Sequence, residues 1–111
     1  MSLDENLNRV LSRYDELQAL MSANEVPAAD EIARLSKEFS DLTPIVQVVN
    51  ELKSARDEAY NLAVMVEAEE DTELRELAAD ELRELKERVP VLERQVQLML
   101  LPKDEVDSKD A

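Results

Sequence analysis

The apolar residues of this 111-residue chain recur at alternating steps of three and four, the spacing that places side chains on one side of an α-helix. The first such stripe consists of Leu3, Leu7, Val10, Tyr14, Leu17 and Met21. Ser2 precedes it and Glu5 follows three positions later, which is the capping-box spacing of a helix start. We therefore predict a helix that begins after Ser2 and ends near Ser22, before Val26-Pro27.

Two more helices are predicted in the next forty residues. The shorter one begins near Ala28, and its apolar face is formed by Ile32, Leu35, Phe39 and Leu42. Thr43 followed by Pro44 is typical of an N-cap and the first helical position, so a third helix is predicted to begin there. Whether it is continuous with the preceding helix stays open at this point. Its stripe consists of Ile45, Val48, Leu52, Ala55, Ala59, Leu62 and Val66.

A fourth helix is predicted after an acidic connection, with Asp71 as its N-cap. Its stripe consists of Leu74, Ala78, Leu82, Leu85, Val89, Leu92, Val96 and Met99. Pro90 lies inside this stripe and predicts a kink or break near residues 86–90. Pro102 is expected to end the helix, and residues 103–111 are predicted to be a disordered linker towards an absent catalytic body.

These helices predict an all-α fold, an antiparallel bundle of three long helices and one shorter helix over residues 1–102, with the last helix kinked near Pro90. The core is expected to be aliphatic, because the chain has only two tyrosines and one phenylalanine. Three methionines on the stripes are predicted to fill the core: Met21, Met65 and Met99.

The residue types that the chain lacks narrow its function. It contains no histidine or cysteine, and so lacks the commonest general base, a thiolate nucleophile and the usual transition-metal ligands. It contains no glycine, and so cannot form a glycine-rich phosphate loop. We therefore predict that it is not an enzyme and takes no cofactor. No apolar run is long enough for a membrane span and no signal peptide is recognisable, so a cytoplasmic location is expected.

The formal net charge of −14 is concentrated in residues 67–87, where ten acidic and three basic residues occur. Such a run is most often a solvated helix face. The alternatives are a contact surface for a basic partner and, with no EF-hand order to support it, a cation site. The candidate contact surface is formed by Glu69, Glu70, Asp71, Glu73, Glu76 and Asp80. Its charge should repel nucleic acid and anionic lipid, so neither direct nucleic-acid binding nor membrane binding is expected.

Two segments of the C-terminal half resemble a known family. Residues Glu73–Leu82 read Glu-Leu-Arg-Glu-Leu-Ala-Ala-Asp-Glu-Leu, and residues Leu98–Asp104 read Leu-Met-Leu-Leu-Pro-Lys-Asp. Together they resemble the N-terminal domain of bacterial class I peptide chain release factors, of the type that reads UAA and UAG. In that family the Leu-Leu-Pro-Lys-Asp element closes the last helix before the catalytic body.

The resemblance implies an accessory, ribosome-binding role in translation termination. It implies two partners, the large-subunit stalk base protein and the GTPase that recycles release factors. The family's Gly-Gly-Gln and Pro-x-Thr motifs are absent, so no catalytic or codon-reading residue is transferred to this chain, which we expect to be a fragment.

Two other functions stay open at this point. One is a free-standing acidic coiled-coil scaffold or chaperone-like interaction protein, which would form stable dimers. The other is an acidic mimic of nucleic acid, against which the dispersal of acids over several faces of residues 1–66 counts.

Overall fold

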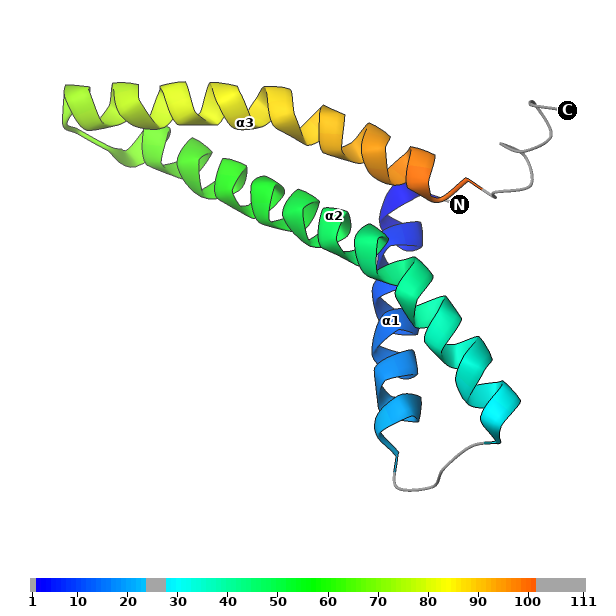
Figure 1. Cartoon of the computed structure of the whole chain (residues 1–111). Helices are drawn as coiled ribbons and strands as arrows, with labels where there is room; N and C mark the ends of the chain where they lie inside the picture. Colours follow the sequence, from blue (N-terminus) through cyan, green and yellow to red (C-terminus); the bar gives the residue numbers. More distant parts are fainter. Residues whose placement is uncertain (1, 24–27, 102–111) are drawn as a thin grey trace, which may run out of the picture. The chain divides into compact units, whose positions relative to one another are not determined.

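The computed structural model describes residues 2–23 and 28–101. Within them lie three α-helices and no strand: α1 (Leu3–Ser22), α2 (Ala29–Ala68) and α3 (Thr72–Met99) (Figure 1). The prediction of an all-α fold is confirmed. The chain divides into two compact units, Met1–Gln47 and Val48–Ala111, and the boundary falls inside α2.

The start of α1 has the predicted cap. The Glu5 amide donates to Ser2 Oγ at 3.1 Å, and the Ser2 hydroxyl lies 3.2 Å from Glu5 Oε1. The serine thus satisfies one of the amides that a helix N-terminus leaves without a partner. The helix ends at Ser22, as predicted, and Pro27 lies outside the described residues.

The predicted separation of the second and third helices is wrong, because α2 runs through Pro44 without a break over 40 residues. Thr43 is not an N-cap: its hydroxyl donates to the carbonyl of Phe39, four residues earlier, at 2.8 Å. Pro44 removes only one backbone donor, and Val46 and Val49, two and five residues later, are buried. The described residues therefore form three helices rather than the four predicted.

Helix α3 begins as predicted at its Asp71 cap, whose Oδ1 accepts from the amides of Glu73 at 2.9 Å and Leu74 at 3.3 Å. The predicted kink near Pro90 is not confirmed, since α3 continues through this residue to Met99. Pro90 is exposed, while Leu85 and Leu92 on either side of it are buried at heptad spacing. Pro102 and the predicted linker 103–111 lie outside the described residues.

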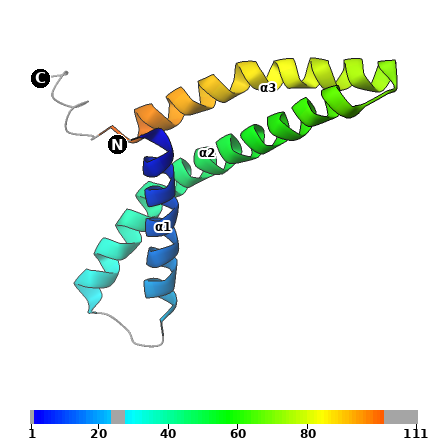
Figure 2. The ribbon, with the colours of Figure 1, turned by 180° about the vertical axis from the view of Figure 1, so that it is seen from behind.

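Unit Met1–Gln47 is an antiparallel pair formed by α1 and the first part of α2 (Figure 2). Leu7, Val10 and Leu17 are buried on α1. Arg13 Nε donates to Glu38 Oε2 at 2.5 Å across the pair. This hydrogen bond, together with the charge of the guanidinium, lowers the pKa of Glu38 against a smaller opposing effect of burial.

Unit Val48–Ala111 contains a second antiparallel pair, formed by the rest of α2 and by α3 (Figures 1 and 2). We call this pair the α2–α3 hairpin. Two ion pairs join its helices: Arg56 to Glu93 at 2.7 Å and Arg88 to Glu51 at 3.3 Å. Its buried apolar side chains are Val48, Val49, Leu52, Ala55, Leu62, Ala78, Leu85, Leu92 and Val96. The predicted antiparallel pairing of long helices is therefore present, whereas one bundle spanning residues 1–102 stays a prediction.

Candidate functional site

The six acids of the candidate contact surface lie around the connection between α2 and α3 and along the start of α3. Glu69 and Glu70 are in the connection, Asp71 is the N-cap, and the other three are on α3. Glu73, Glu76 and Asp80 follow one another at steps of three and four, so they share one side of that helix. We call these three residues the outer acidic face.

Half of the candidate surface has a local structural role. Asp71 caps α3, and Glu69 Oε1 accepts from the Asp71 amide at 3.2 Å. Asp80 forms an ion pair with Arg83 at 3.1 Å. The side chains of Glu70, Glu73 and Glu76 are exposed and contact no polar group of the described residues. These three carboxylates are therefore available to an external partner.

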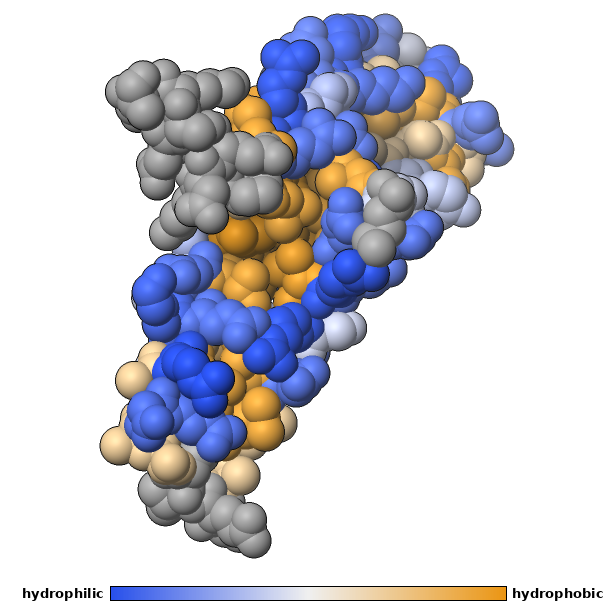
Figure 3. All heavy atoms as spheres, turned by 90° about the vertical axis from the view of Figure 1, so that its right-hand side faces the viewer, coloured by the Kyte–Doolittle hydropathy of each residue, from blue (hydrophilic) through white to orange (hydrophobic). Residues whose placement is uncertain are grey.

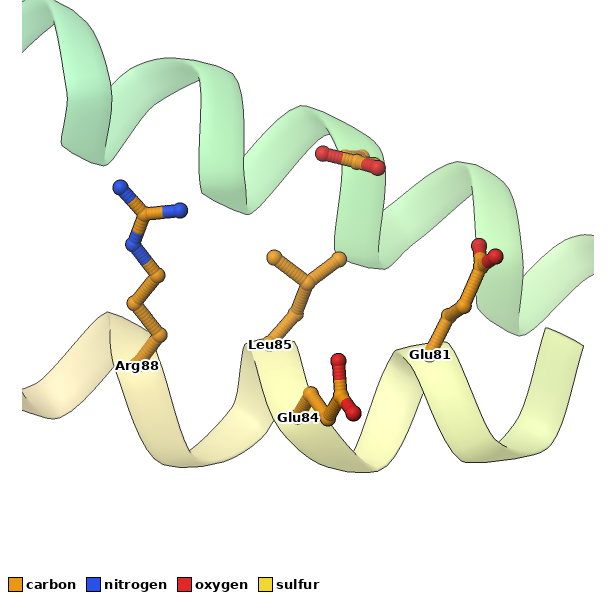
Figure 4. Close-up of a pocket in the computed structure, with 5 residues that line it drawn as sticks. Glu81, Glu84, Leu85 and Arg88 are labelled. Atoms are coloured by element: carbon orange, nitrogen blue, oxygen red, sulfur yellow. The ribbon is translucent and has the colours of Figure 1, made fainter.

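A second group of acids lines a shallow pocket of about 330 Å³ on the α2–α3 hairpin. Glu81 and Glu84 belong to the acidic run 67–87 seen in the sequence, whereas Glu58 and the pocket itself were not predicted. Its lining residues are Glu58, Glu81, Glu84, Leu85 and Arg88. In Figure 4 the side chains of Glu81, Leu85 and Arg88 extend from α3 towards α2. Leu85 is buried and provides the apolar floor. The acids come from two helices, and only the pairing of these helices brings them together.

Exposed apolar side chains lie near these acids along the chain. Met65, Leu74 and Leu77 are 46%, 51% and 57% exposed. The prediction that Met65 fills the core is therefore wrong, as is the inclusion of Leu74 in the buried stripe of α3. The same prediction for Met21 is also wrong, because Met21 is 43% exposed. Figure 3 views the molecule from the end away from the α2–α3 connection, where other hydrophobic side chains also reach the surface among hydrophilic ones. Such exposed apolar groups beside charges are typical of a protein-contact surface.

The described residues offer neither a metal site nor a membrane-spanning helix. Among residues 2–23 and 28–101, no three histidine, cysteine, aspartate or glutamate side chains are grouped so that they could hold a metal ion. None of the described helices is both long and apolar enough to cross a membrane. What the geometry of the described residues offers is negative charge beside exposed apolar surface.

Comparison with known proteins gives the family. The PCRF domain matches residues 10–111. The chain is 38% identical over 109 residues to Peptide chain release factor 1 of Rhodospirillum rubrum and 42% identical over 108 residues to that of Rhizobium rhizogenes. A third relative of the same name, from Gluconacetobacter diazotrophicus, is 38% identical over 111 residues.

These alignments cover 98%, 96% and 100% of this chain but 30% of each relative, so the chain spans about 30% of the length of the curated relatives it matches. No solved structure matches it. The resemblance predicted from Glu73–Leu82 and Leu98–Asp104 is confirmed. The family match and the three relatives establish that this chain belongs to the PCRF domain family of peptide chain release factors.

Proposed function

We propose that the chain acts in translation termination as the helical, ribosome-facing domain of a peptide chain release factor, in the cytoplasm. The relatives named Peptide chain release factor 1 supply the context. The observation that carries the proposal is the set of exposed carboxylates at the α2–α3 connection and on the outer acidic face, of which Glu70, Glu73 and Glu76 have no partner within the described residues.

The charge favours a protein partner over RNA. Ribosomal RNA presents phosphates, which repel carboxylates, whereas a basic ribosomal protein attracts them. The partner we propose is the large-subunit stalk base protein, with the GTPase that recycles release factors as a second partner, both by resemblance to the family. Rim charges of this kind affect the association rate and orientation more than the final affinity. We also propose that this chain by itself releases no peptide from peptidyl-tRNA.

Cosedimentation of the 111-residue chain with purified ribosomes tests this function. We expect binding that weakens between ~50 and ~300 mM salt, because screening shortens the reach of surface charges. Neutralising the outer acidic face with Glu73→Gln, Glu76→Gln and Asp80→Asn should lower binding several-fold. Absence of cosedimentation at low salt, or peptide release by the chain alone, would contradict the proposal.

A free-standing coiled-coil scaffold is not favoured, because the family match covers nearly the whole chain. Analytical ultracentrifugation separates the two ideas. A scaffold forms stable dimers at micromolar concentration, whereas the proposed domain functions as one copy.

A further inference from the structure

The α2–α3 hairpin has a side on which contacts repeat along its length. At one level, Glu51 on α2 pairs with Arg88 on α3. Seven residues further along α2, Glu58 shares a pocket with Glu81 and Glu84 of α3. Because the helices are antiparallel, a step of seven residues forward on α2 corresponds to a step of seven residues back on α3. The two levels follow this rule: Glu51 to Glu58 is seven residues forward, and Arg88 to Glu81 is seven residues back.

The same step places exposed apolar residues at the next level. Seven residues is close to two turns of an α-helix, so residues seven apart lie on nearly the same side. Advancing from Glu58 gives Met65, and stepping back from Glu81 and Glu84 gives Leu74 and Leu77. All three of these apolar side chains are at least 46% exposed.

We call this side the hairpin flank, and it has three levels. Its ion-pair level is Glu51 with Arg88, its acidic level is Glu58 with Glu81 and Glu84, and its apolar level is Met65 with Leu74 and Leu77. Neighbouring levels are separated by about 10 Å, from the rise of 1.5 Å per residue. The flank is distinct from the outer acidic face in its residues and in the presence of an apolar level.

We propose that the hairpin flank binds a basic amphipathic segment of a partner protein, with apolar side chains over the apolar level and lysine or arginine over the acidic level. The inference rests on the proposed function only in taking a protein as partner. The chemistry sets the spacing of the recognised pattern: the apolar and basic groups of the partner are about 10 Å apart, which is two turns of a helix.

Charge complementarity selects this occupant over the others. The acidic level carries three carboxylates, and Arg88, which lines the same pocket, forms an ion pair with Glu51. A second copy of this chain would bring the same carboxylates against one another, and RNA or an anionic lipid would bring phosphates. A cationic partner with an apolar end satisfies both levels.

The probe for this proposal is a synthetic helical peptide with two leucines and, two turns further on the same face, three arginines. Its affinity for the 111-residue chain is measured by isothermal titration, and its position by chemical-shift changes in the ¹H–¹⁵N spectrum. We expect shifts concentrated at Met65, Leu77, Glu81 and Glu84. A peptide of equal composition, with the arginines moved to the opposite face, should bind much more weakly.

The variants separate the two levels. Glu58→Gln with Glu81→Gln and Glu84→Gln should lower the affinity for the probe about tenfold, since each exposed ion pair contributes about a twofold factor. Leu77→Ser should lower it several-fold without changing the salt dependence. All of these residues are exposed, so the helical circular dichroism of the variants should match that of the parent chain.

A matched control removes three negative charges elsewhere on the hairpin, with Asp57→Asn, Glu67→Gln and Glu87→Gln, all at exposed positions outside the flank. It should change the affinity by less than about twofold, a limit for screened long-range charge. Equal losses in the control and the flank variant would overturn the proposal. Equal binding of the two peptides, or Leu77-dependent dimers or vesicle binding in place of peptide binding, would also overturn it.

Failure of this inference and failure of the proposed function are distinguishable. If the chain binds ribosomes and the flank variants bind them equally well, the function stands and the flank proposal is wrong. If the chain does not bind ribosomes, the function fails, while the peptide titration still decides whether the flank recognises the basic amphipathic pattern.

Discussion

Replacing Pro44 by alanine tests whether α2 is one helix. In the structure Pro44 lies inside a 40-residue helix and is exposed, so alanine removes no buried packing. It restores the amide that proline lacks and relieves the clash of the ring with the carbonyl of Ser40. Pro44→Ala should therefore stabilise the chain.

The magnitude follows from the position. Proline in a helix interior is about 3 kcal/mol less favourable than alanine, and local adjustment around a native proline reduces this gain. The Thr43 hydroxyl, which donates to Phe39 O at 2.8 Å, is one such adjustment. We expect a gain of about 1–3 kcal/mol. If a helix instead began at Pro44, the same substitution would be nearly neutral, because proline is favoured at the first helical position.

Urea unfolding followed by circular dichroism at pH 7 measures this gain as a higher midpoint with an unchanged slope. Thr43→Ala is the companion variant: with a continuous α2 it has a small effect, whereas loss of an N-cap would cost about 1 kcal/mol. A Pro44→Ala midpoint equal to or below that of the parent, combined with a costly Thr43→Ala, would refute the continuous helix.

Two further predictions concern single side chains. Asp71→Ala removes the acceptor of two amides at the start of α3 and should lower the free energy of unfolding by about 1 kcal/mol. Asp71→Asn keeps an acceptor oxygen and should retain most of the parent stability. Equal losses in urea midpoint for the two variants would contradict the capping role. Because the pKa of Glu38 is lower in the folded chain than its ordinary value of 4.5, its contribution is present above that value and is lost as the pH falls through the lowered pKa. Glu38→Gln should therefore lower the urea midpoint at pH 7, and this gap should shrink as the pH falls below 4.5; a gap that does not shrink in acid would refute this account.

The sequence predicted the helix starts at Ser2 and Asp71 because a cap is local, requiring only a side-chain oxygen within three residues of the amides it binds. It predicted a false start at Thr43-Pro44 for the same reason. Between Phe39 and Val48 the apolar residues take three successive steps of three, so the stripe shifts around the helix there. A shifting stripe next to a proline resembles a boundary, and only the structure shows that α2 continues through it from Ala29 to Ala68.

The candidate site shows a similar limit. Density of acids along the chain was enough to predict the outer acidic face, since Glu73, Glu76 and Asp80 belong to one helix. The density of acids was not enough to predict the pocket, because Glu58 lies on α2 and Glu81 on α3, with the end of α2 and the connection between them. Periodicity gives the side of each helix on which a residue lies. The register between two helices depends on how their buried side chains pack against one another.

That register also explains why two residues of the apolar level, Met65 and Leu74, were assigned to the core. Met65 and Leu74 continue the stripes of their helices by one further turn, and a stripe extended to the end of a helix predicts burial. Near the connection the helices have fewer neighbours, so these side chains keep 46% and 51% of their surface exposed. Where an apolar stripe extends beyond the helix it packs against, its last side chains stay exposed to water. On this hairpin these exposed side chains lie about two helical turns from the three carboxylates of the acidic level. Burying them without losing that charge requires a partner that is apolar at one end and cationic at the other.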